Sequence, residues 1–477
     1  MIPPPPAPPH PAAAPPEPLT VLPHPDARLV DGQTGVVLAG AALRAAVDAA
    51  AAALAALPPG LVVALMPSTV DAVLGYLGAL SARRPVALLD PALPADVLHD
   101  LVGRYRPAVV TGVGDHPSPP GYTADRCEPP GPIWRAATPA GTGPTDTGHP
   151  DLGLLLATSG STGSPRLVRL SRRGLLANVV AVTAALGITA DEVTVTSLPL
   201  YYTYGLTVLN THLSAGATVV LDRRGLLDRD FWATVGHHRV TSLAAVPYQY
   251  EMLSRIRFDP AAYPSLRTLT QAGGRLRRDL VVDFHQRMRA HGGELVVMYG
   301  QTEAGRMAIL PPGRLPDRAD SAGAAIPGGR FSVGAGDEIV YHGPNVMMGY
   351  ASSAADLARG DELGGVLATG DVGRLDADGL LYLTGRTQRF SKVFGVRISL
   401  DDVERMLQHR GAVAAVGGDD RIVVWAEGAP SDRCAEIRRE LSGRIGLHSS
   451  GFAVRGIDHL PLLSSGKVDY RALQQRG

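Results

Sequence analysis

Short apolar runs alternate with helical patterns along most of this chain, and this alternation restricts its fold more than any other feature. In the first third, strand-like runs at 61–66, 86–89 and 108–113 enclose helical patterns at 71–82 and 96–105. A second run from 193 to 299 repeats the alternation, with strands expected at 193–198, 217–221, 242–246, 266–270 and 295–298. Such alternation predicts an α/β fold in which mostly parallel sheets are flanked by helices.

The remaining segments predict smaller units around these sheets. An Ala-rich helix is expected at 35–57, and the Pro-, Gly- and Thr-rich stretch 117–150 is typical of a long surface connection. Hairpin patterns at 337–343 and 373–386 predict a small antiparallel β unit. We therefore expect a disordered Pro-rich leader at 1–20, a large N-terminal domain at 21–387 and a small, mobile α+β C-terminal domain at 388–477.

Charge and cysteine content argue against several classes of function. The 477 residues carry 45 basic and 45 acidic side chains, so nothing in the net charge points to nucleic acid or to a membrane surface. Cys127 and Cys434 are far apart in sequence and predict neither a disulfide framework nor a metal site. The N-terminus lacks the pattern of a signal peptide, and Arg44 and Asp48 interrupt the best candidate span, so we expect a cytoplasmic location.

A loop of small residues follows one of the apolar runs. Residues 154–156 are leucines, and 159–164 read SGSTGS, followed by Arg166. Glycines allow left-handed backbone, hydroxyls and N–H groups can surround a phosphate, and Arg166 supplies positive charge. A Gly/Ser turn without a ligand is the usual explanation of such a string taken alone. Its position between a strand and the helical pattern at 175–186 favours a phosphate site instead.

A second segment, with two glycines upstream of it, carries polar groups suited to a nucleotide. The sequence at 298–305 is MYGQTEAG, and Gly273 and Gly274 lie upstream. Tyr299 offers a flat face for a purine, Thr302 a hydroxyl for a phosphate oxygen, and Glu303 a carboxylate for Mg²⁺. The glycines leave room for a base close to the backbone.

The last two segments place a carboxylate and a lysine near the end of the chain. Asp371 follows a Gly, and an Asp beside a Gly is more often a turn residue than a ligand. We expect Asp376 and Asp378 to be turn residues, and Asp371 to be a ligand-binding residue. Gly466 predicts a tight turn that presents Lys467, whose long cationic side chain suits a site of moving negative charge.

In this order and spacing, the four segments are similar to the motifs of the adenylate-forming ligase superfamily, which comprises acyl-CoA and aryl-CoA synthetases, nonribosomal peptide adenylation domains and beetle luciferases. The resemblance implies ATP and Mg²⁺, with Asp371 and Arg386 at the ribose and Gly395 beside an incoming thiol. It implies that Lys467, Glu303, Thr302 and Arg386 are catalytic. The cofactor-binding residues would be Thr158, Ser159, Gly160, Ser161, Thr162, Gly163, Arg166, Gly273, Gly274, Tyr299, Gly300, Asp371 and, toward the thiol, Gly395.

Several positions depart from the family pattern. Arg166 stands where the family usually has Lys, and Gln388 occupies a hinge position that is usually charged. Tyr202 replaces a His, and Thr203 stands where amino-acid-activating members carry Asp, which disfavours an ordinary α-amino acid. The expected acyl pocket, with few charges, consists of Tyr202, Tyr204, Val246, Gln271, Gly273 and Gln301.

The resemblance implies activation of a small carboxylic acid as its acyl-adenylate, with release of pyrophosphate and transfer of the acyl group to a thiol. CoA and carrier-protein phosphopantetheine are both open as acceptors, and so is an amine. A non-catalytic nucleotide-binding protein is the alternative from another class. Because Lys467 and Gly395 would serve different half-reactions, we expect the residues after Arg386 to rotate about Gln388.

Overall fold

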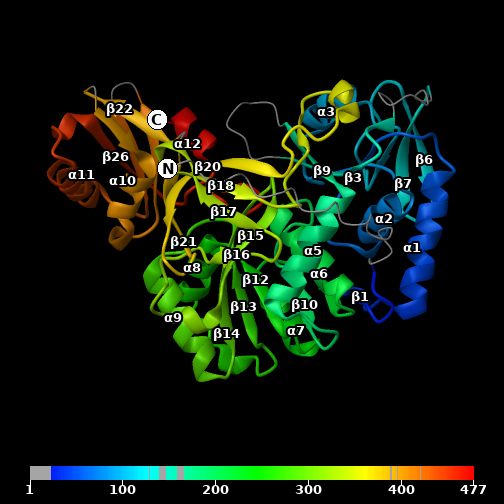
Figure 1. The fold of residues 1–477 in the computed structure, drawn as a ribbon, viewed down its shortest axis with the longest axis horizontal. Coiled ribbons are helices and arrows are strands. Elements are labelled where there is room, and N and C mark those ends of the chain that lie inside the picture. Colours follow the sequence, from blue (N-terminus) through cyan, green and yellow to red (C-terminus); the bar gives the residue numbers. More distant parts are fainter. Residues whose placement is uncertain are drawn as a thin grey trace, which may run out of the picture.

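The computed structural model describes residues 23–127, 129–138, 147–157, 166–386, 389–394, 396–418 and 421–476, and Figure 1 labels the helices and strands within them. The predicted leader at 1–20, the loop residues 158–163, Gln388 and Gly395 lie outside the described residues, so their roles stay predictions. The predicted α/β architecture is confirmed, because two large sheets are flanked by helices and a separate antiparallel sheet adjoins them.

The larger sheet is parallel through its middle and antiparallel at both edges. In spatial order, its strands are β16 (Ala324–Ala325), β15 (Gly305–Leu310), β14 (Glu294–Gln301), β13 (Thr268–Gln271), β12 (Ser242–Ala245), β10 (Val193–Val195), β11 (Thr218–Leu221), β1 (Arg28–Asp31) and β2 (Val37–Ala39). β15 turns back against β14, and β2 turns back against β1. Every residue of β12 is buried, as expected for a strand covered on both faces.

The second large sheet has the same plan. Its strands, in spatial order, are β19 (Gly349–Ala351), β9 (Leu167–Ser171), β8 (Leu152–Ala157), β4 (Val86–Leu89), β3 (Val62–Leu65), β5 (Val109–Thr111), β7 (Gly131–Ala136) and β6 (Tyr122–Cys127). The middle strands β8, β4, β3 and β5 are parallel. The pairs β8–β9 and β6–β7 are antiparallel hairpins.

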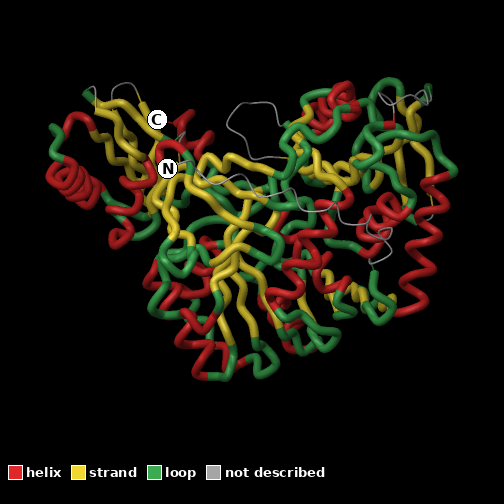
Figure 2. The backbone as a smooth tube through the Cα atoms, in the orientation of Figure 1, coloured by secondary structure: helices red, strands yellow, loops and turns green. Residues whose placement is uncertain are grey.

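Helices form layers on both sides of each sheet (Figure 2). Alternate residues of β3 enter two different apolar clusters, since Val62 and Ala64 face one and Val63 and Leu65 face the other. The first cluster joins both sheets to α1 (Gly40–Ala55), α2 (Val70–Ser81) and α6 (Thr203–Ser214), so these helices lie between the sheets. The outer faces carry α3 (Ala95–Tyr105) on the second sheet and α7 (Arg229–His237), α8 (Pro247–Arg255) and α9 (Arg278–Ala290) on the first.

A smaller antiparallel sheet follows, as the hairpin patterns predicted. It consists of β17 (Arg330–Val333), β18 (Glu338–His342), β20 (Val366–Leu375) and β21 (Leu381–Arg386). The register of β20 against β21 pairs Asp371 directly with Arg386. The fold therefore brings together two residues that are 15 positions apart in the chain.

The residues from 389 onward bury their own apolar side chains in two clusters, one around Val403 and Ile437 and one around Trp425 and Leu473. In Figure 1 they form the orange and red part at one side of the molecule. The predicted α+β content is present, whereas the domain boundary and the motion stay predictions. The elements are β22 (Phe390–Val393), β23 (Val396–Ser399), α10 (Leu400–Met406), β24 (Val413–Gly418), β25 (Arg421–Glu427), α11 (Ser431–Ile445), β26 (Phe452–Ile457) and α12 (Tyr470–Arg476).

Two sequence-based expectations were wrong in detail. The stretch 117–150 is not a connection throughout, because β6 and β7 lie in it, and the mostly exposed β6 has no apolar alternation to predict it. The helical pattern at 175–186 does not follow the loop of small residues directly either. After the loop, β9 pairs with β8, and only then does α5 (Arg172–Leu186) begin, with the Ser171 hydroxyl accepting from the Gly174 N–H.

Candidate functional site

Asp371 is the centre of a compact hydrogen-bond network on β20. Its side chain is 5% exposed, and Arg386 donates its Nε–H to Oδ1 at 2.9 Å. The Tyr299 hydroxyl and the Gln301 amide both donate to Oδ2, the latter at 2.6 Å. Asp371 lies within strand β20, so it is not a turn residue. Asp376 accepts hydrogen bonds from two N–H groups of the following turn, as predicted.

This network leaves room for a limited number of new hydrogen bonds. A carboxylate offers about four acceptor positions, and three of those of Asp371 are filled by protein donors. Arg386 is the donor that can most easily leave, because 57% of its side chain is exposed. One acceptor position on Oδ1 therefore stays open beside the exposed Arg386 side chain.

Glu303 lies in the turn between β14 and β15, and Tyr350 lies between it and Arg166 at the end of the predicted phosphate loop. The Tyr350 hydroxyl donates to Glu303 Oε1 at 2.8 Å, and the guanidinium of Arg166 lies 4.5 Å from the Tyr350 ring centroid. Within the described ranges, nothing donates a hydrogen bond to the other carboxylate oxygen of Glu303. Oxygen donors of this kind suit Mg²⁺. The part of the chain that the structure describes holds no cluster of three or more acidic, His or Cys ligands.

Lys467 lies on the tight turn that the sequence predicted. Gly466 has φ +77°, and the N–H of Leu463 donates to the carbonyl of Lys467 at 2.8 Å. The ammonium of Lys467 lies 5.3 Å from the centroid of the Tyr202 ring. The C-terminal turn therefore reaches the predicted acyl pocket.

The charges that act on Lys467 come from two other segments of the chain, 303–306 and 371–386. Burial, together with repulsion from Arg386 and Arg306, lowers the pKa of Lys467 to about 8. Glu303 and Asp371 oppose this shift by favouring the charged ammonium. The nucleotide side, the metal-binding candidate and the C-terminal lysine thus face one common region.

Val246 joins the two glycine turns that border the predicted acyl pocket. A Cβ on Gly273 would lie 2.5 Å from the Tyr202 hydroxyl and 3.1 Å from Val246, and Gly273 has φ +86°. A Cβ on Gly466 would lie 2.7 Å from Val246. No other residue type fits either position without movement.

The other predicted residues have structural contacts of their own. Gln271 is buried and donates its amide N–H to the carbonyl of Gly274, which braces that turn. A Cβ on Gly300 would lie 2.1 Å from the carbonyl oxygen of Gly305, so glycine is required where β14 meets β15. Thr302 lies in the turn between them. The roles of these residues toward ligands stay predictions.

Sequence reasoning missed Arg306 on β15, three residues after Glu303. Its side chain is buried, the residue being 3% exposed, and the guanidinium lies 4.3 Å from the Tyr204 ring centroid. A buried cation therefore lies beside Tyr204, one of the residues of the pocket that was expected to hold few charges. The presence of an arginine inside the apolar strand GRMAIL was the available signal.

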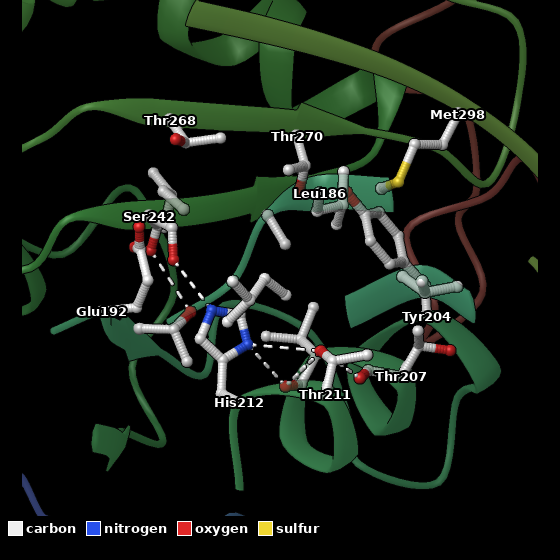
Figure 3. A pocket seen from close by; sticks show the side chains of 16 residues that line it. Leu186, Glu192, Tyr204, Thr207, Thr211, His212, Ser242, Thr268, Thr270 and Met298 are labelled. Carbon is white, nitrogen blue, oxygen red and sulfur yellow. Dashed lines mark hydrogen bonds between the residues drawn. The ribbon is translucent and has the colours of Figure 1, made fainter. Parts of the chain in front are cut away.

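Behind Tyr204 lies a small cavity of about 40 Å³ between α6 and strands β12 to β14 (Figure 3). The Tyr204 hydroxyl is hydrogen-bonded to Thr270, and His212 contacts the Val208 carbonyl through Nδ1 and Ser242 through Nε2. A carbonyl can only accept, so Nδ1 carries the proton, and burial lowers the pKa of His212. The cavity is large enough for a few atoms only.

Comparisons with known proteins agree with this geometry. A family model described as AMP-binding enzyme matches residues 20–351. An indoleacetate–CoA ligase of Aromatoleum aromaticum is 34% identical over 354 residues, which are 68% of this chain and 67% of that protein. A salicyl-AMP ligase of Mycobacterium tuberculosis is 28% identical over 86% of this chain and 75% of its own length. An isonitrile lipopeptide synthase of Streptomyces coeruleorubidus is 29% identical over 86% of this chain but only 29% of its own length.

The fold also matches solved structures. An o-succinylbenzoate CoA synthetase from Bacillus subtilis, in complex with its acyl-adenylate, has a TM-score of 0.72 at 21% identity, with 94% of each chain covered. Among the described helices, none is both long and apolar enough to cross a bilayer. The family model and the fold lead to one conclusion: the chain belongs to the AMP-binding enzymes, the adenylate-forming ligase family whose motifs its sequence resembles.

Proposed function

We propose that this chain activates a carboxylic acid with ATP, releases pyrophosphate and transfers the acyl group from the adenylate to a thiol. The convergence of Lys467, Glu303 and Asp371 on one region carries the proposal, because each supplies a different requirement of the reaction. Asp371 suits a ribose, Glu303 suits a cation on phosphate, and Lys467 suits the reacting carboxylate.

The described residues fit a nucleotide and a divalent cation. Asp371 and Arg386 would hold the ribose, while Arg166 and the loop at 158–163 would hold the phosphates. Glu303, together with phosphate oxygens, would hold Mg²⁺, which offsets the charge of the triphosphate when bound. Tyr350 keeps Glu303 in place by donating to one of its oxygens.

In the first half-reaction, an oxygen of the substrate carboxylate attacks the α-phosphorus, and the bond to the β-phosphate bridging oxygen breaks. The positive charge of Lys467 would attract both the carboxylate and the α-phosphate and so stabilise the charge that builds up between them. Tyr202 lies beside Lys467 and would border the space for the acid. In the second half-reaction, the thiol attacks the acyl carbonyl, AMP leaves and a thioester forms.

The acceptor of the acyl group in this proposal is a thiol. Relatives include proteins named as CoA ligases and one named as a salicyl-S-ArCP synthetase, so free CoA and a carrier-protein phosphopantetheine are both supported. Rotation of residues 388–477 about Gln388, with Gly395 beside the thiol, belongs to the same proposal.

ATP–pyrophosphate exchange across a panel of carboxylic acids tests the first half-reaction. We expect exchange that depends on both an acid and Mg²⁺, and its absence with every acid, in protein that still binds ATP, would overturn the proposal. The acceptor assay then offers the preferred acid with CoA, with a phosphopantetheinylated carrier protein and with an amine.

A further inference from the structure

Arg306 is the described charge with the most unusual surroundings. The residue is 3% exposed, and no described side chain or carbonyl accepts a hydrogen bond from its guanidinium, whose Nε is buried. The neighbouring rings of Tyr202 and Tyr204 cannot neutralise it, because burial raises the pKa of both tyrosines and keeps their hydroxyls uncharged. An arginine stays protonated in nearly every protein environment, so a full charge is buried here without a counterion among the described residues.

The backbone around Arg306 is held firmly in place. The side-chain amide of Asn178 contacts both backbone groups of Arg306, donating to its carbonyl at 2.8 Å and accepting from its N–H at 3.3 Å. Asn345 donates to the same carbonyl at 3.3 Å. Asn178 and Asn345 are both buried. The backbone that carries this buried side chain is therefore held in place, and the guanidinium itself stacks on Tyr204.

A buried, unpaired guanidinium costs stability, and its stacking on Tyr204 offsets only part of that cost. A buried charge that lacks a partner within the described protein is a candidate ligand-binding group. The guanidinium presents five N–H donors in a planar fork, which matches the two oxygens of a carboxylate. Tyr202 interacts electrostatically with Arg306, and its ring lies 5.3 Å from the Lys467 ammonium, so the two cations share this tyrosine as a neighbour.

We propose that Arg306 binds a second carboxylate on the acid substrate, so that the preferred substrates are dicarboxylic acids. This inference rests on the proposed function for the reacting carboxylate, which lies at Lys467, and it adds the substrate class. The distal carboxylate pairs with Arg306, while Tyr204 forms the wall beneath the guanidinium.

The test compares straight-chain dicarboxylic acids of three to eight carbons with monocarboxylic acids of equal length, by ATP–pyrophosphate exchange. The best dicarboxylic acid should exceed its monocarboxylic counterpart in kcat/KM by about 100-fold or more, because a site built for a polar group rejects an analogue that lacks it. Arg306→Met should abolish that preference, and Arg306→Lys should restore part of it. Equal use of both acid classes by the unaltered protein would overturn the proposal.

Arg374→Met is the matched control. Arg374 also stacks on a tyrosine, Tyr382, at 4.4 Å, but it is exposed on β20, so its loss should leave the preference unchanged. If Arg306→Met instead lowers exchange with every acid by one common factor, Arg306 serves the phosphate or the reacting carboxylate, and the proposal is wrong.

A binding measurement without ATP separates this inference from the proposed function. The preferred dicarboxylic acid should raise the Tm of the unaltered protein and of Arg374→Met, but not that of Arg306→Met. Such a shift without any exchange would support the carboxylate site and reject the enzymatic function. Exchange with monocarboxylic acids, without a Tm shift for any dicarboxylic acid, would support the enzymatic function and reject the carboxylate site at Arg306.

Discussion

Asp371 and Arg306 are both buried charges, yet their surroundings are opposite. Asp371 accepts hydrogen bonds from Tyr299, Gln301 and Arg386, whereas Arg306 faces two neutral tyrosines and has no described acceptor. The first charge is satisfied before a ligand arrives, and the second is not. The difference is expected if the nucleotide, the constant ligand of the family, meets a preformed network while the acid itself completes the other side.

Lys467 borders both regions, and its loss should have the largest effect. We expect Lys467→Ala to lower acyl-adenylate formation by about three orders of magnitude, because a central electrostatic group is removed. Thiol-dependent consumption of synthetic acyl-adenylate should change only a few-fold. Single-turnover assays of each half-reaction measure this, and an equal loss in both would show that Lys467 is needed for the fold or for both steps.

Glu303→Gln tests whether the preformed side depends on charge or only on shape. The amide keeps the size of the side chain but cannot neutralise a cation, so adenylation should fall by about two orders of magnitude. Raising the Mg²⁺ concentration should recover part of the activity. A folded variant with nearly normal exchange would remove Glu303 from the site.

The titration of Lys467 gives a test by pH. The pKa of Lys467 is lowered to about 8, so its side chain is deprotonated above that pH in the unliganded protein. Above pH 8, kcat/KM for adenylation should therefore fall about tenfold per pH unit. Lys467→Arg should move this limb to higher pH. In the unfolded chain, Lys467 stays protonated up to about pH 10.5. The contribution of Lys467 to the free energy of unfolding should therefore rise with pH between about 8 and 10.5. A pH–rate profile without a limb near 8 would contradict the burial of Lys467.

The two buried charges should respond oppositely in stability. Asp371→Asn weakens a satisfied network and should lower the free energy of unfolding by about 1–3 kcal/mol. Arg306→Met removes an unpaired charge and should leave the free energy of unfolding unchanged or raise it. Urea unfolding of both variants without ligand measures this. A large loss of stability in Arg306→Met would mean that its charge is paired within the protein.

Tyr350→Phe should have the smallest effect. It removes one hydrogen bond to Glu303 while keeping the ring beneath Arg166, so adenylation should fall only about fivefold, corresponding to about 1 kcal/mol. Tyr382→Phe, in the antiparallel sheet, is the control and should have no effect. A loss as large as that of Glu303→Gln would mean that Tyr350 itself contacts the substrate.

The sequence predicted the parallel cores well because their signal is local. β4 matches its predicted bounds of 86–89, and β12 ends one residue short of its predicted end. β9 was missed because Arg169 interrupts its apolar run. That arginine is fully buried and donates to the carbonyls of Met348 and Tyr350, contacts that only the fold creates.

The candidate site was predictable where motifs carry it and not where packing does. Glu303, Asp371 and Lys467 lie in recognisable segments, and the structure brings them into one region. Arg306 was missed because an arginine after a motif is usually solvated, and only the fold places Asn178 against its backbone and Tyr204 against its guanidinium.

On the proposed function, Val246 would couple the size of the acid to the rate of the reaction. Its side chain lies against both the turn at Gly273 and the turn at Gly466, so one residue would form the wall of the acid site and support the turn that carries Lys467. An acid that displaced Val246 outward would then also displace the lysine from the phosphate. Oversized acids would therefore bind and yet react slowly, so that the chain would reject them by rate and not by affinity.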